Sequence, residues 1–170
     1  MIAIPPSGQI QLVTSGANAQ DVAAIMVDII HQLAAADTVT YDMALEAISQ
    51  SCGDTVCDLA VHVYDLANFQ PDTQYQTIRT PARLQRDGKA NCVDYTVTLA
   101  ALAKALDLPV VFRIAKFSRD EPYTHVYPVI DGVPVDLCIG QDFLTSTGSR
   151  DPVPTVGLEV PSYQVKEYTI

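Results

Sequence analysis

Apolar side chains recur at helical spacing in the first part of the chain. Between Ala19 and Ala36 they lie on one face of a predicted helix, at Val22, Ile25, Met26, Ile29, Ile30 and Leu33. This pattern is typical of an amphipathic helix that faces a core, and Asn18 stands where an N-cap is expected. The residues before it, Ile2 to Thr14, predict an extended arm that ends in a short strand.

Two shorter helices are predicted next. Thr40 is expected to cap a helix from Tyr41 to Ser51, and Asp54 a helix from Thr55 to Ala67. Gly53 between them favours a tight corner. The second of these helices is expected to pack through Cys57, Ala60, Val61 and Tyr64.

The pattern changes from helix to strand in the second half. The run Val110 to Ala115 is almost entirely apolar, which indicates a strand covered on both faces. Two further runs, Tyr123 to Ile130 and Val133 to Cys138, flank Asp131-Gly132, a strong signal for a two-residue hairpin. Residues 141–170 are rich in Gly and Pro and predict an extended tail with a short strand near Tyr163 to Tyr168.

The stretch from Arg83 to Pro109 passes from a polar loop into an Ala- and Leu-rich helix, with Cys92 at the junction. Asn91 is a suitable N-cap, and Asp94 completes a capping-box-like pair. Cys92 therefore lies in the first helical turn, where backbone N–H groups and the helix dipole favour a thiolate. A buried structural cysteine explains the residue as well.

The predicted hairpin relates a histidine to a carboxylate. Counting outward from the turn, one face of the sheet carries His125, Tyr127, Asp136 and Cys138. His125 and Asp136 are then diagonal neighbours with Cβ atoms roughly 7 Å apart. A slip of one residue would separate them. Asp136 lies in an apolar strand, where a carboxylate without a partner is costly, so the pair favours a functional site.

Composition narrows the class of protein. The chain has 170 residues, 48% of them hydrophobic, which indicates one globular domain. We expect an extended arm over residues 1–17, a core over 18–140 and a tail over 141–170. The net charge of −10 argues against a nucleic-acid partner. No stretch is long and apolar enough to predict a membrane span, and the first residues lack the pattern of a signal peptide. We therefore expect a cytoplasmic protein or one incorporated in a virion.

The four cysteines are irregularly spaced, and we interpret them as reduced thiols. No C-x-x-C pair occurs, and the three histidines are scattered along the chain, so a metal site is not expected. No cofactor is predicted.

One set of segments resembles a known family. The chain resembles the transglutaminase-like superfamily, including its compact prokaryotic and phage members, in a series of ordered segments. These are R-T-P-A-R-L-Q-R-D-G-K-A-N-C-V-D-Y, a helix that ends A-L-D-L-P, a strand, and then T-H-V-Y-P-V and V-P-V-D-L. The resemblance covers about Tyr75 to Leu137. It implies an α+β fold with a papain/transglutaminase-like core, in which N-terminal helices and a central cysteine-bearing helix pack on a small antiparallel sheet.

The resemblance also implies roles for individual residues. Cys92 matches the family nucleophile, His125 the general base and Asp136 the residue that orients the histidine. Asp94 matches an acidic residue that follows the nucleophile. Two departures stand out: Ala90-Asn91 precedes the cysteine where the family often has Gly-x, and Asp107 replaces the glycine at the helix end.

The chain has no Trp, so the Trp that serves the oxyanion in cross-linking transglutaminases is missing. The backbone N–H of Cys92 and the side chain of Gln85 are candidate oxyanion donors. Asn91 and Tyr127 are expected to support the site.

Two functional hypotheses follow. The first is a thiol-dependent acyl-transfer enzyme with a Cys92-His125-Asp136 triad that hydrolyses an amide bond in a protein or peptide substrate, with transamidation less favoured because Trp is missing. The second is a structural or adaptor protein of a larger assembly, such as a phage particle, which docks through the C-terminal tail.

Overall fold

The computed structural model describes residues 8–13, 19–49, 53–71, 75–138 and 155–170. Its helices are α1 (Ala19–Ala36), α2 (Thr38–Ser49), α3 (Thr55–Leu66), α4 (Pro81–Asp87) and α5 (Cys92–Ala105). Its strands are β1 (Gln9–Val13), β2 (Asn68–Phe69), β3 (Tyr75–Arg79), β4 (Lys89–Ala90), β5 (Val110–Lys116), β6 (His125–Ile130), β7 (Val133–Asp136), β8 (Thr155–Val156) and β9 (Gln164–Thr169).

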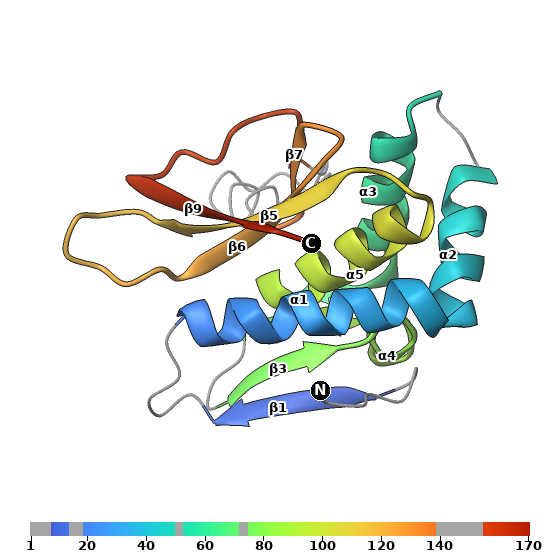
Figure 1. The fold of residues 1–170 in the computed structure, drawn as a ribbon, viewed down its shortest axis with the longest axis horizontal. Helices are drawn as coiled ribbons and strands as arrows, with labels where there is room; N and C mark the ends of the chain where they lie inside the picture. The colour runs from blue at the N-terminus through green and yellow to red at the C-terminus, as the bar shows by residue number, and fades with distance from the viewer. Residues whose placement is uncertain (1–7, 14–18, 50–52, 72–74, 139–154) are drawn as a thin grey trace.

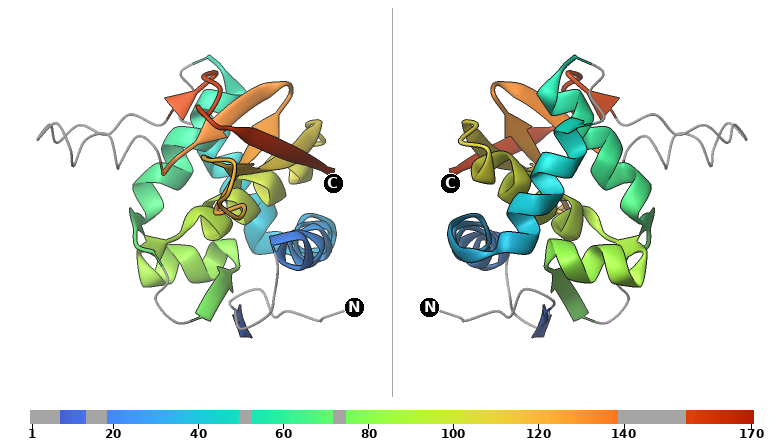
Figure 2. Two further views of the ribbon diagram at one scale, coloured as in Figure 1. Left: turned by 90° about the vertical axis from the view of Figure 1, so that its left-hand side faces the viewer. Right: turned by 90° about the vertical axis from the view of Figure 1, so that its right-hand side faces the viewer.

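Helix α5 is the centre of the fold (Figure 1). Every residue from Val93 to Ala103 is buried, most of them apolar, with Asp94, Thr96 and Thr98 as the buried polar residues. It packs against α1, α2, α3 and the strands β5 and β6. Helices α1 and α3 lie on opposite sides of it (Figure 2). The start of α5 is therefore held from several directions.

The main sheet has five strands in the order β8-β7-β6-β5-β9, with every neighbouring pair antiparallel. Two smaller pairs, antiparallel β1 with β3 and parallel β2 with β4, lie outside it. Figure 1 shows β1 and β3 on the far side of α1 from the main sheet. This arrangement confirms the predicted α+β class, with a cysteine-bearing helix packed on a small antiparallel sheet.

The predicted hairpin is present. Ile130 pairs with Val133, and Asp131 and Gly132 form the turn with φ of 50° and 79°. Positive φ at both turn residues is the geometry that favours Asp-Gly. The strands are shorter than predicted, since β6 begins at His125 and β7 ends at Asp136.

Three local predictions were wrong. Helix α2 begins at Thr38, because Asp37, not Thr40, accepts the N–H groups of Val39 and Thr40. In α3, Ala60 is buried and Tyr64 packs against the core as predicted, but Val61 is 43% exposed, and the rest of the buried face is Val56, Leu59 and Val63. The predicted polar loop at Arg83 belongs to α4, which Thr80 caps, Pro81 begins and Gly88 ends in the left-handed conformation.

The ends of the chain are partly described. Strand β1 confirms the short strand expected after the N-terminal arm. Strand β9 confirms the one expected near Tyr163 to Tyr168, and it pairs with β5, so this part of the predicted tail belongs to the main sheet. The predicted cap Asn18, Cys52 and residues 141–154 lie outside the described residues.

Within the described ranges, no single helix has the length and apolar content of a membrane span; only α1 and α2 taken together, with a bend of 81° between them, meet those criteria.

Candidate active site

Cys92 begins α5, and the local sequence fixes it there. The Asn91 side chain accepts the N–H of Asp94 at 2.9 Å, and the Asp94 carboxylate accepts the N–H of Asn91 at 3.0 Å. This reciprocal pair is the predicted capping box. Asn91 also donates from its amide to the Thr77 carbonyl oxygen at 3.2 Å, which ties the cap to β3. Cys92 itself is only half-buried, so its sulfur borders solvent.

Asp94 also binds Arg79, a contact that the sequence did not indicate. Its carboxylate also accepts the backbone N–H of Arg79 at 2.7 Å and an N–H of the Arg79 guanidinium. Burial raises the pKa of Asp94 to about 6, against the opposing effect of the Asn91 N–H and Arg79. Asp94 therefore joins the start of α5 to the end of β3.

Thr96 connects α5 to β6, the strand that carries His125. Its hydroxyl lies 2.8 Å from the Cys92 carbonyl oxygen and 3.2 Å from the Val126 carbonyl oxygen. The shorter contact is the familiar bond of a helical Thr to the residue four positions before it. The longer one crosses to β6 beside His125. One side chain thus fixes the distance between the cysteine helix and the histidine strand.

His125 and Asp136 meet across the hairpin, as predicted. His125 Nε2 donates to Asp136 Oδ2 at 2.5 Å, and the other carboxylate oxygen accepts the N–H of Cys138 at 2.8 Å. Asp136 is 1% and His125 11% exposed at the side chain. Cys138 is buried beside the pair, and the paired positions of the hairpin, Val129 with Pro134 and Ile130 with Val133, end before it.

The charge state of His125 follows from its neighbours. Burial by itself lowers the pKa of the ring, but hydrogen bonds with Asp136 and with the Cys92 side chain raise it, to about 10 in balance. Because Nε2 is bonded to Asp136, Nδ1 is the ring nitrogen left for Cys92. At neutral pH the site is thus suited to an imidazolium between a carboxylate and a sulfur.

Aromatic rings surround the histidine. The Tyr127 ring stacks on it with centroids 6.1 Å apart and planes 24° from parallel, and Phe117 lies at 6.1 Å with planes tilted by 38°. Tyr127 is 1% exposed, whereas Phe117 is 46% exposed. Tyr127 was expected to support the site and does contact the ring. Phe117 lies at the end of the preceding strand, and nothing in the sequence pattern singled it out.

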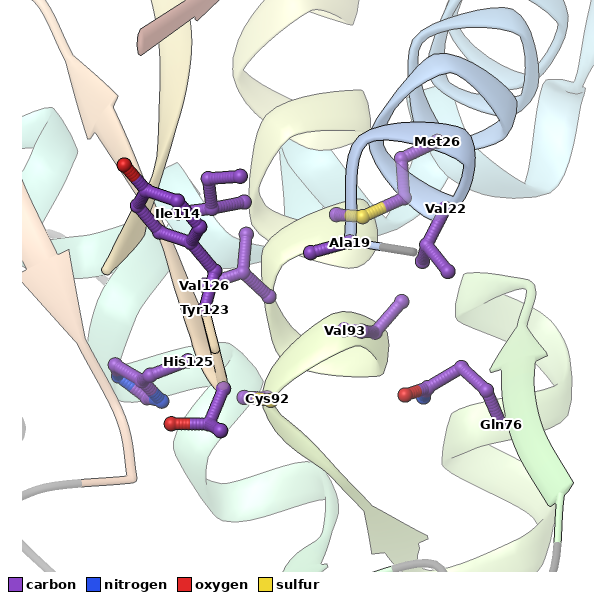
Figure 3. Close-up of a pocket in the computed structure, with 11 residues that line it drawn as sticks. Ala19, Val22, Met26, Gln76, Cys92, Val93, Ile114, Tyr123, His125 and Val126 are labelled. Atoms are coloured by element: carbon purple, nitrogen blue, oxygen red, sulfur yellow. The ribbon is translucent and has the colours of Figure 1, made fainter. Parts of the chain in front are cut away.

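Cys92 and His125 line one pocket (Figure 3). Gln76 on β3 lines it too, and in this view its amide points inward from the side opposite His125. Gln85 was the expected second oxyanion donor, but it is exposed on α4 and does not line this pocket. Sequence reasoning missed Gln76 because the strand that presents it, β3, was not predicted.

Within the described residues, no group of three or more His, Cys, Asp or Glu side chains is placed to bind a metal ion. The three cysteines found there, Cys57, Cys92 and Cys138, are free thiols.

The structure contains the features that the resemblance implied: a cysteine at a helix N-terminus, packed on an antiparallel sheet that carries a histidine bonded to an aspartate. No protein-family model matches the sequence, and no curated protein matches it.

Two solved structures are similar in fold. One is a crystal structure of a TGase, 18% identical, with a TM-score of 0.40 over 73% of this chain. The other is described as a candidate cysteine protease from Cytophaga hutchinsonii, 10% identical, with a TM-score of 0.45 over 95% of this chain. The chain spans 34% of the length of the first and 58% of the second.

Proposed function

We propose that the chain is a thiol-dependent acyl-transfer enzyme of the transglutaminase-like type, which hydrolyses an amide bond in a protein or peptide. The observation that carries this proposal is the position of His125, which is bonded to the buried Asp136 and lines one pocket together with Cys92, whose side chain helps to raise the pKa of the ring. A nucleophile, a base and a group that orients the base are the parts that covalent acyl transfer needs.

In the first half of the reaction, the Cys92 thiolate attacks the amide carbonyl carbon and His125 holds the proton. The bond from carbon to nitrogen then breaks, the imidazolium gives its proton to the leaving amine, and a thioester remains on Cys92. In the second half, water attacks the thioester while His125 takes a proton from it. The carboxylic acid leaves, and the thiolate and imidazolium are restored. Asp136 stabilises the imidazolium in both halves.

The carbonyl oxygen needs hydrogen-bond donors when it becomes negative. The N–H of Cys92 has no acceptor within its own helix, because the first N–H groups of a helix never do. Gln76 supplies the second donor in this proposal, since its amide faces the same pocket. Its amide nitrogen also lies 3.3 Å from the Thr77 carbonyl oxygen, a bond that holds the side chain on β3.

The decisive experiment compares two cysteines. We expect Cys92→Ala to abolish hydrolysis of a peptide library while leaving the melting temperature within a few degrees, and Cys57→Ala, which removes a half-buried thiol on α3, to leave the hydrolysis unchanged. With iodoacetamide at pH 6, Cys92 should be alkylated far faster than Cys57. Equal rates and no hydrolysis would instead favour the structural or adaptor role.

Transfer to an amine is tested in the same assay. Hydroxylamine competes with water for a thioester, so hydroxamate should form if the acyl-enzyme exists. If hydroxamate exceeds the carboxylic acid product even at low hydroxylamine concentration, the activity is transamidation and not hydrolysis.

A further inference from the structure

The pocket that Cys92 and His125 line is a cavity of about 250 Å³ between α1 and the main sheet (Figure 3). Among the described residues, the buried part of its lining is apolar and comes from four elements: Met26, Val93, Ile114 and Val126, each at most 5% exposed. Ala19 and Val22, at the start of α1, are half-buried and lie closer to solvent. The cavity therefore has an apolar floor, and its more exposed side lies at the start of α1.

Among the described residues, the lining contains no Asp, Glu, Lys or Arg, although the chain as a whole has a net charge of −10. Its polar side chains are Gln76, Cys92, Tyr123, Thr124 and His125. A charged group pushed against the apolar floor would lose its water without gaining a partner. An apolar group would instead leave water at no such cost.

We propose that this cavity binds the side chain of the acyl residue of the substrate, and that this side chain is apolar and of leucine, methionine or phenylalanine size. The proposal rests on the proposed function and names its substrate class. A cavity of 250 Å³ is smaller than the roughly 300–1,000 Å³ of pockets that take whole drug-sized ligands. It exceeds the roughly 150 Å³ of an apolar cavity that takes benzene, so one large side chain fits.

The order of chemical steps decides which half of the substrate occupies the cavity. The acyl part stays bonded to the Cys92 sulfur through both halves of the reaction, so it benefits from a pocket that borders Cys92. The leaving amine must depart before water arrives at the thioester. A deep pocket with a buried floor would retain it, so the leaving group is assigned to the solvent side of His125.

The test uses three chloromethyl ketones that differ only in one side chain: acetyl-leucyl, acetyl-glycyl and acetyl-glutamyl. Each alkylates a thiol by forming a bond from sulfur to carbon and releasing chloride, and mass spectrometry locates the label on Cys92. Each buried methylene is worth about a factor of four in affinity. We expect the leucyl probe to label Cys92 on the order of 100-fold faster than the glycyl probe, and the glutamyl probe no faster than the glycyl one.

A matched pair of variants places the selectivity in the cavity. Ala19→Phe puts a ring at the opening and should reduce the leucyl-to-glycyl ratio to near one, while the glycyl rate stays within a few-fold. Ala24→Phe makes the same change on the exposed face of the same helix and should keep the ratio. A wild-type ratio near one, or a faster glutamyl probe, overturns the proposal even where a variant does not fold.

The outcome also separates this proposal from the one on which it rests. Alkylation needs only attack by the sulfur, so the probes report on the cavity whether or not amides are hydrolysed. Hydrolysis without a leucyl preference overturns the cavity assignment alone. A leucyl preference without any acyl turnover overturns the acyl-transfer function alone.

Discussion

Replacing Asp136 with Asn tests whether the buried carboxylate sets the reactivity of the sulfur. The substitution keeps the shape of the side chain and one acceptor oxygen for the Cys138 N–H, which lies at 2.8 Å from Oδ1. It removes the charge that faces His125 Nε2 at 2.5 Å. The hairpin should therefore still fold, while the ring loses the anion that holds its proton.

The magnitude follows from the pKa of the ring. A pKa of about 10 in place of the ordinary 6.5 corresponds to roughly 5 kcal/mol in favour of protonated His125. The bond to Asp136 is the largest contribution that raises it, and burial, which lowers it, remains in the variant. The pKa of the ring should then fall, and the ring should assist the sulfur less. Because each pKa unit corresponds to a tenfold change, we expect Cys92 alkylation to slow by about 10-fold or more.

The assay is the rate of iodoacetamide labelling at pH 6.5, followed by mass spectrometry of the Cys92 and Cys57 peptides, so that Cys57 serves as the internal standard. Asp131→Asn is the matched control, because it makes the same chemical change in the turn of the same hairpin, and Asn tolerates the φ of 50° there. An Asp136→Asn protein that is folded and still labels Cys92 at the wild-type rate would refute the charge relation between carboxylate, ring and sulfur.

Three further predictions concern stability. Thr96→Val should lower the free energy of unfolding by about 1 kcal/mol in urea titrations, because it removes the hydroxyl that joins α5 to β6. Thr98→Val is the control and should not lower it, since the Thr98 hydroxyl is buried without a partner among the described residues. Asp107→Gly should raise the melting temperature by roughly 2–4 °C, because Asp107 has a φ of 58° at the end of α5, a left-handed conformation that glycine adopts without strain. Ala24→Gly is the control and should lower the melting temperature, because glycine is a poor helix former. The pKa of His125 is higher in the folded chain than in the unfolded one, so its stabilisation is complete below pH 6.5 and is lost as the pH rises towards 10. Unfolding curves over this range should show that loss, and His125→Gln should flatten it.

The site was predictable to the extent that it depends on short-range chain geometry. The Asp131-Gly132 turn fixes the register of its own hairpin, and register decides which side chains share a face. That single signal places His125 beside Asp136. The cap at Asn91 is likewise a matter of four consecutive residues, so the position of Cys92 at a helix start was predictable too.

The remainder depends on contacts between segments far apart in the sequence. Strand β3 exists because it pairs with β1, more than sixty residues earlier, and its own residues Tyr75–Arg79 alternate only weakly. Without β3, neither Gln76 nor the Arg79 contact to Asp94 could be foreseen. The start of α2 was misplaced because Asp37 and Thr40 are both good caps, and the choice between them shifts the helix by three residues.

The hairpin that carries His125 and Asp136 also bears on the order in which the site is assembled. The two partners are separated by only eleven residues and a two-residue turn, so they can meet early, while the chain is still largely unfolded. Cys92 reaches them only when α5 docks, an event that needs α1, α2, α3 and the sheet together. Conditions that unfold the helices but not the hairpin should therefore leave the His125–Asp136 pair intact and Cys92 unreactive. The rate of Cys92 labelling is then a sensitive measure of complete folding.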